Sequence, residues 1–166
     1  MKRLISIFIV GTILVAISAC KDNNNFEKLR KNELAKLNEY LDANYPKEVP
    51  KPSGLYFIPV NEGVGDSTIR VGDQVKIYYA TWLIDSTLID QTTGYLEGFR
   101  YEPYEFIVGA GNSIAGLEEA VTYMKKGGIA NLIIPSELAY KQTPKNGVPA
   151  FSTLLMQVEI YKVYRP

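Results

Sequence analysis

The side chains of this chain that could do chemistry are carboxylates, tyrosines and lysines. The sequence has no histidine and one cysteine, Cys20, but it has 12 tyrosines, 18 acidic residues and 18 basic residues. Without histidine there is no triad, zinc site or proton shuttle built on imidazole. One cysteine excludes a disulfide framework and a thiolate metal cluster. What remains is carboxylate, phenol or amine chemistry, or a site that acts through shape and exclusion of water.

Length and charge narrow the possible functions further. The 166 residues suffice for one main domain with a substantial core and an additional segment. The formal net charge of zero gives no electrostatic case for nucleic acid as a partner, because nucleic-acid binding requires a basic face. Nothing in the composition calls for a metal or a cofactor.

The first twenty residues have the pattern of a targeting signal. A basic start, Met1-Lys2-Arg3, precedes an apolar run over 4–17. As a helix this run would span about 21 Å, short of the roughly 30 Å hydrocarbon core of a membrane. It ends in Ile17-Ser18-Ala19-Cys20, which resembles the lipobox of bacterial lipoproteins, where the cysteine is acylated after cleavage.

We therefore expect a lipoprotein signal peptide over 1–19 and lipidation of Cys20. The protein would then be anchored to a membrane of the bacterial cell envelope without spanning it. The alternatives are an ordinary signal peptide with an incidental cysteine, or an uncleaved anchor.

Residues 20–52 are predicted to form a tether, an amphipathic helix and a Pro-rich hinge. The segment 26–45 lacks Gly and Pro, and Pro46 and Pro50 end the helical pattern. The expected apolar stripe, with Leu34 at its edge, consists of Phe26, Leu29, Leu37, Tyr40, Leu41 and Asn44. Such a helix could lie on its own domain as a spacer, or it could form a homodimer.

Residues 53–166 alternate in the way that short strands do, around one helical pattern. We expect strands over 55–60, 75–82, 104–108, 129–135 and 154–161, and a helix over 114–124 capped by Asn112 or Ser113. These elements predict an α+β fold in which a curled, mainly antiparallel sheet wraps on one short helix.

Several segments of this domain, in the same order, resemble the FKBP family of peptidyl-prolyl isomerases. They cover about two thirds of the chain, and no single one is decisive alone. The matching segments are 53–56, 62–65, 72–79, 88–90, 106–109, 114–120, 133–140, 148–149 and 154–160.

The resemblance implies functional roles for ten residues of the domain. It implies catalytic roles for Tyr79, Asp90, Ile114 and Tyr140, with the Ile114 N–H and the Tyr140 hydroxyl binding carbonyl groups of the substrate. It implies substrate-binding roles for Ile89, Tyr104, Phe106, Leu117, Val148 and Met156. Without the resemblance, the apolar members of this set would be read as core.

Isomerisation of an X-Pro bond suits a chain without histidine. Rotation of a peptide bond costs ~18–20 kcal/mol because amide resonance is lost. Both isomers of an X-Pro bond are close in energy, so a catalyst needs only to lower this barrier. Water bound to the amide carbonyl favours the planar form, and a dry apolar pocket around the proline would therefore speed rotation.

The sequence departs from the family pattern at several of these positions. Leu117 stands where the family usually has Trp, and both Ile89 and Met156 stand where it has Phe. Lys141 replaces the Gly that commonly follows the tyrosine, and the segment 91–103 is longer than usual. The pocket therefore stays apolar but loses flat aromatic surface, and the longer segment becomes either part of the rim or a surface loop.

Three functions follow as alternatives. The first is a lipid-anchored isomerase that assists the folding of exported, proline-containing polypeptides. The second is a binding module on the same fold that grips a peptide or partner without useful catalysis. The third is a structural envelope lipoprotein that contacts partners through the helix over 26–45.

Overall fold

The fold is one curled antiparallel sheet with a single helix packed across one face. A computed structural model describes residues 25–65 and 67–166. After an N-terminal helix over 25–44, the elements in chain order are β1 (Tyr56–Asn61), β2 (Gln74–Leu83), β3 (Leu88–Gln91), β4 (Tyr104–Ile107), α2 (Ala115–Thr122), β5 (Ile129–Ile134), the 3-10 helix η1 (Ser136–Leu138) and β6 (Leu154–Tyr164). This arrangement confirms the predicted α+β class.

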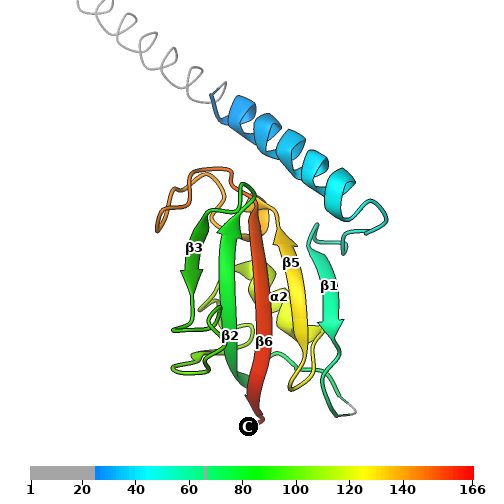
Figure 1. The fold of residues 1–166 in the computed structure, drawn as a ribbon, viewed down its shortest axis with the longest axis vertical. Coiled ribbons are helices and arrows are strands. Elements are labelled where there is room, and N and C mark those ends of the chain that lie inside the picture. The colour runs from blue at the N-terminus through cyan, green and yellow to red at the C-terminus, as the bar shows by residue number, and fades with distance from the viewer. Residues whose placement is uncertain (1–24, 66) are drawn as a thin grey trace, which may run out of the picture.

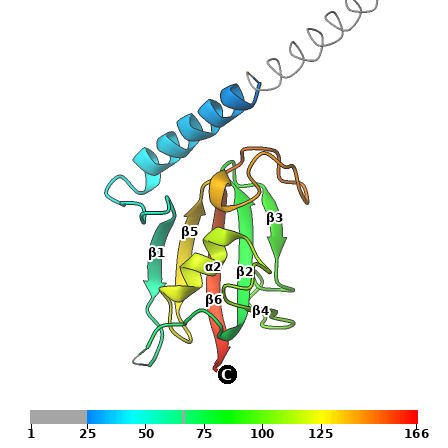
Figure 2. The same cartoon turned by 180° about the vertical axis from the view of Figure 1, so that it is seen from behind.

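Within the described residues the sheet has six strands, in the order β1-β5-β6-β2-β3, with β4 also paired to β2. All of the pairings are antiparallel. β4 pairs with one half of β2, over Gln74–Ile77, and β3 pairs with the other half, over Ala80–Trp82. The helix α2 lies behind the sheet in Figure 1 and in front of it in Figure 2, which is the same view turned by 180°. The sequence missed β3 as a separate strand because this four-residue strand alternates between exposed and half-buried positions and buries no side chain fully.

The core lies between α2 and the inner face of the sheet, which is the face that α2 covers. Leu117 and Val121 of α2 are buried with Ile77 of β2 and Val158 of β6. A Cβ added at Gly116 would lie 2.5 Å from Cγ2 of Ile134, so only glycine allows α2 to approach β5 this closely.

The expected capping of this helix by Asn112 or Ser113 is wrong. Ile114 is the N-cap residue and makes no side-chain capping bond. Instead the Glu118 carboxylate accepts hydrogen bonds from the backbone N–H groups of Gly109 (2.9 Å), Gly111 (3.3 Å) and Ser113 (3.0 Å). The acidic side chain in the first turn therefore folds the preceding loop back onto the helix.

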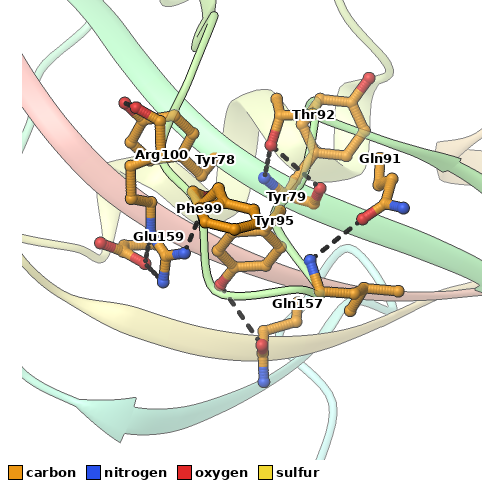
Figure 3. A network of polar contacts seen from close by, with 10 residues as sticks. Tyr78, Tyr79, Gln91, Thr92, Tyr95, Phe99, Arg100, Gln157 and Glu159 are labelled. Atoms are coloured by element: carbon orange, nitrogen blue, oxygen red, sulfur yellow. Dashed lines mark hydrogen bonds and ion pairs between the residues drawn. The ribbon is translucent and has the colours of Figure 1, made fainter.

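The long segment 91–103 packs on the outer face of the sheet, opposite α2, and not at the rim of a pocket. Tyr95 is 6% exposed and stacks on Tyr78 of β2, with ring centroids 6.4 Å apart. The Arg100 guanidinium lies 4.6 Å from the Tyr95 ring centroid and hydrogen-bonds Glu159 of β6 at 2.9 and 3.0 Å. Figure 3 shows this cluster, in which the Tyr95 hydroxyl also donates to Gln157.

The N-terminal helix lies across one end of the sheet on the same outer face (Figure 1). Leu37 and Leu41 are buried against Ile133, whereas Phe26 and Leu34 remain 38% and 41% exposed. The helix therefore lies on its own domain, and a homodimer through it stays a prediction. Cys20 and the predicted signal peptide fall outside the described residues. No helix within 25–65 and 67–166 is both long enough and apolar enough to cross a membrane.

Tyr95→Ala should detach the segment 91–103 from the sheet and lower the free energy of unfolding by about 3 kcal/mol, the usual cost of truncating a buried aromatic side chain. Urea unfolding measures this loss. Tyr101 lies in the same segment but is 58% exposed, so Tyr101→Ala should change stability by less than about 0.5 kcal/mol. Equal losses for the two variants would contradict the packing described.

Candidate functional site

A cavity of about 810 Å³ opens where the start of α2 meets β2, β3 and the loop that follows η1. It is large enough for a short peptide segment. Of the ten residues to which the sequence assigned roles, the cavity is lined by Tyr79, Ile89, Asp90, Tyr104, Ile114, Leu117, Tyr140, Val148 and Met156. The predicted residues are thus brought together from six separate parts of the chain: β2, β3, β4, the start of α2, the segment between η1 and β6, and β6.

Phe106 is the exception, and the prediction that it binds substrate has to be corrected because it does not line the cavity. Its side chain is 3% exposed within the core and does not line the cavity. It stacks on Tyr104, with ring centroids 5.4 Å apart, and so supports that tyrosine from behind. Both residues point to the same side of β4, and alternation alone cannot tell a cavity wall from the packing beneath it.

Tyr79 and Asp90 form the polar contact at one wall. They lie on the paired strands β2 and β3, and the Tyr79 hydroxyl donates to Oδ2 of Asp90 at 2.6 Å. Burial, followed by the hydrogen bond to Asp90 and its charge, raises the pKa of Tyr79 well above its usual value. Thr92 lies at the start of the long segment, directly after β3. Its hydroxyl accepts a hydrogen bond from the backbone N–H of Tyr79 and donates one to the carbonyl oxygen of Tyr79 (Figure 3).

Tyr104 connects this wall to the loop before α2. Its ring meets that of Tyr79 edge-on, with centroids 6.0 Å apart and planes at 79°. Its hydroxyl donates to the carbonyl oxygen of Asn112 at 2.9 Å. The loop is therefore held at one end by Tyr104 and along its length by Glu118, and the position of Ile114 is well determined.

Two hydrogen-bond donors at the cavity remain available to a ligand. Ile114 precedes the first turn of α2, and within the described residues its backbone N–H has no acceptor. The Tyr140 hydroxyl likewise makes no hydrogen bond within the described part of the chain. Burial, then the charge of Asp90, raises the pKa of Tyr140, so its proton is retained at neutral pH. Two carbonyl oxygens of a peptide could accept from these donors.

Several residues of the cavity were not predicted from the sequence. Thr81 and Leu154 line it because they lie two positions from Tyr79 on β2 and from Met156 on β6. Strand alternation could have predicted both. Lys141 and Lys145 add positive charge, and the Lys145 ammonium lies 5.5 Å from the Tyr140 ring centroid. Lys141, which stands where the family pattern has glycine, has φ +56°, a left-handed conformation that glycine adopts more readily than lysine.

The cavity therefore has an apolar patch, which includes Ile89, Leu117 and Met156, bordered by polar and charged side chains. In the part of the chain that the structure describes, no three His, Cys, Asp or Glu side chains gather as a possible metal site. Such a chamber can hold an apolar ring, bind two carbonyl oxygens and exclude water from the group between them.

The raised pKa of Tyr79 predicts a specific loss of stability at alkaline pH. The unfolded chain releases this proton near pH 10, whereas the folded protein retains it to higher pH. The associated stabilisation is complete below pH 10 and is lost as the pH rises above that value. Above pH 10 the free energy of unfolding of the wild type should fall more steeply than that of Tyr79→Phe, by up to about 1.4 kcal/mol per pH unit. Urea unfolding at stepped pH tests this, and parallel pH profiles would contradict it.

Known proteins share both the sequence pattern and the fold. Residues 65–161 match the model of the family described as "FKBP-type peptidyl-prolyl cis-trans isomerase". The "FKBP-type 22 kDa peptidyl-prolyl cis-trans isomerase" of Escherichia coli (strain K12) is 38% identical over 128 residues, which cover 75% of this chain and 58% of that relative. The "FK506-binding protein" of Neisseria meningitidis serogroup B is 34% identical over 67% of this chain and 97% of its own length.

Among solved structures, FkpA from Escherichia coli superposes with a TM-score of 0.70 at 30% identity, covering 94% of this chain and 72% of that one. The peptidyl-prolyl cis-trans isomerase of Pseudomonas syringae pv. tomato superposes with a TM-score of 0.68 at 22% identity, which shows the shared fold. With a family match over more than half of the chain and with its strands, helix and cavity in the expected places, this protein belongs to the FKBP-type peptidyl-prolyl cis-trans isomerase family.

Proposed function

We propose that this protein catalyses cis-trans isomerisation of X-Pro bonds in exported polypeptides, and that it is held to a membrane by a lipid on Cys20. The observation that carries the enzymatic part is the cavity itself. It joins apolar walls to two unengaged donors, the Ile114 N–H and the Tyr140 hydroxyl, on the fold of an isomerase family.

The geometry suits a reaction in which no bond is broken. The proline ring would enter the apolar chamber over Leu117, and the Ile114 N–H and Tyr140 hydroxyl would bind carbonyl oxygens on either side of the rotating bond. Removing water from the carbonyl of the residue before the proline destabilises the planar X-Pro amide relative to the twisted one. Because the rotation makes and breaks no σ bond and transfers no proton, no general acid, nucleophile or metal is needed.

Asp90 and Tyr79 would keep the polar rim of the chamber in one arrangement. The hydrogen bond of 2.6 Å between them leaves the second carboxylate oxygen of Asp90 able to interact with the strained amide. Loss of the Asp90 carboxylate would therefore remove a charge from the rim and free the Tyr79 hydroxyl to rotate.

The isomerase proposal is tested by the refolding of a protein whose slow step is an X-Pro bond. The full-length chain in detergent should accelerate this step, and Asp90→Ala or Tyr140→Phe should each lower kcat/KM about tenfold, the effect of losing one hydrogen bond of roughly 1.4 kcal/mol. Tyr161→Phe, on the outer face of the sheet, is the matched control and should retain full activity. A folded wild-type protein that accelerates no X-Pro step would overturn the proposal.

A non-catalytic binding module is the second candidate, and one observation favours it. Three cavity positions that are aromatic in the family pattern are aliphatic here, at Ile89, Leu117 and Met156. The chamber remains dry but offers less flat surface to a proline ring. Calorimetric binding of proline-containing peptides, without any acceleration of their isomerisation, would support this candidate over the enzyme.

The proposed membrane anchor rests on the sequence pattern that ends at Cys20. A lipid on this cysteine would place the domain in the bacterial cell envelope, joined to the membrane through a short polar tether. The homodimer through the N-terminal helix is a further proposal. It relies on the exposed side chains of Phe26 and Leu34, and sedimentation as a monomer would rule it out.

Replacing the cysteine tests the anchor directly. In bacterial cells, Cys20→Ser should abolish incorporation of labelled palmitate and move the protein from the membrane fraction to the soluble fraction. The lipid provides the only membrane affinity in this proposal, at about 0.8 kcal/mol for each buried methylene. If Cys20→Ser takes up no labelled palmitate but still remains in the membrane fraction, lipidation is not what anchors the protein.

A further inference from the structure

Glu33 is a buried carboxylate that the proposed mechanism does not use. It lies on the N-terminal helix, is 4% exposed and faces the domain. Its two oxygens accept hydrogen bonds from the backbone N–H of Ser136 (2.7 Å), the hydroxyl of Ser136 (2.7 Å) and the hydroxyl of Thr153 (3.0 Å). Arg30, one turn earlier on the helix, completes the set at 2.5 Å.

The two partners of Glu33 in the domain lie at opposite ends of one wall of the cavity. Ser136 begins η1, and Thr153 immediately precedes β6. The segment between them, 137–152, contributes to the cavity Glu137, Ala139, Tyr140, Lys141, Lys145, Asn146 and Val148. One carboxylate on the helix therefore binds both ends of the segment that carries Tyr140.

Ser136 passes this restraint on to the backbone around Tyr140. Its carbonyl oxygen accepts from the N–H groups of Ala139 and Lys141, both at 2.9 Å, which are the residues on either side of Tyr140. The carbonyl oxygen of Lys141 in turn accepts from the Phe151 N–H at 2.8 Å. Hydrogen bonds thus connect Glu33 to the turn that presents the Tyr140 hydroxyl.

Glu33 is well suited to hold this turn because it is charged. Burial by itself would raise its pKa, but hydrogen bonds from the side chain and backbone of Ser136 and from Arg30 outweigh burial and lower it. Hydrogen bonds to an ionised group are stronger than those to a neutral one, and truncating a buried charged partner leaves its donors unpaired. Arg30 also pairs with Glu137 at 3.5 Å, next to Ser136.

We propose that Glu33 is a positioning residue for Tyr140, so that the N-terminal helix is part of the substrate-binding machinery and not only a spacer between membrane and domain. This inference rests on the proposed isomerase function for its kinetic consequence, but its structural consequence can be measured without any activity.

The test compares Glu33→Gln with the wild type in the full chain, kept in detergent. The amide puts a donor group where an oxygen accepted hydrogen bonds. Amide hydrogen exchange at Ala139, Lys141 and Phe151 should become about tenfold faster, as expected when local opening is easier by about 1.4 kcal/mol. Exchange at Gly127 and Ile160, at the far end of the sheet, should not change. Glu39→Gln, on the exposed face of the same helix, is the matched control.

The kinetic readout is a double-mutant cycle with Tyr140→Phe. Glu33→Gln alone should lower kcat/KM about fivefold to tenfold. In a protein that already carries Tyr140→Phe it should lower kcat/KM by less than about twofold, because the hydroxyl that Glu33 positions is then absent. Additive losses would overturn the proposal. Isomerisation by neither protein would refute the proposed function, while faster exchange at Ala139 and Lys141 would still support the positioning role.

A second pair of variants separates positioning from general stability. Ser136→Ala removes one of the bonds to Glu33 and should increase exchange at the same amides by about twofold to threefold, even if Glu33→Gln does not fold. Leu41→Ala weakens docking of the helix without touching Ser136 or Thr153. If exchange at Ala139 and Lys141 rises equally in Leu41→Ala and Glu33→Gln, or in neither, Glu33 has no positioning role.

Discussion

The close contact between α2 and β5 at Gly116 is the constraint on which the rest of this structure depends. Because Gly116 places no side chain between the helix and Ile134, α2 packs close to the sheet. Leu117 and Val121 are therefore buried in one core with residues of β2 and β6. The start of the same helix then stands at the edge of the sheet, where its first N–H groups have no helical partners. Core and cavity are in this way two consequences of one packing arrangement.

The two faces of the sheet have separate roles. The inner face builds the core and the cavity, whereas the outer face is covered by two segments that add to the domain. The long segment 91–103 binds it through Tyr95 and Arg100, and the N-terminal helix binds it through Leu37 and Leu41. Both segments are also connected to the cavity through hydrogen bonds. Thr92 hydrogen-bonds the backbone of Tyr79, and Glu33 hydrogen-bonds Ser136. Segments packed outside the sheet are therefore hydrogen-bonded to residues next to or within the cavity on its other side.

The cavity combines an apolar patch, which includes Ile89, Leu117 and Met156, with polar and charged side chains, and the patch is the part that suits rotation about an amide bond. The walls need only exclude water from the bound proline, so Leu117 can replace a larger aromatic ring provided that the wall stays apolar. The polar groups have a narrower tolerance, because a donor displaced by about 1 Å no longer meets its acceptor. The aliphatic replacements at Ile89, Leu117 and Met156 all fall at wall positions, whereas Tyr79, Asp90 and the loop before Ile114 are held by hydrogen bonds.

The local pattern of the sequence predicted five of the six strands and the helix after residue 114, because alternation and helical spacing state which side chains share a face. The order of weak motifs identified the family, and this resemblance is the source of the predicted roles of Tyr79, Asp90, Ile114 and Tyr140. The sequence could not separate Phe106 from Tyr104, because both point the same way from one strand and only packing depth distinguishes them. It also misread the cap of α2, since the carboxylate that organises the loop comes from Glu118, inside the helix.

Only the tertiary structure decided where the added segments lie. The segment 91–103 has the polar and aromatic composition of a rim or of a surface loop, and its place on the outer face follows from stacking against Tyr78. Glu33 is an ordinary polar residue in a helical pattern, and its burial arises from partners 103 and 120 residues away in the chain. Periodicity describes a residue relative to its own element, whereas a buried charge is stabilised by donors that folding brings from distant ones.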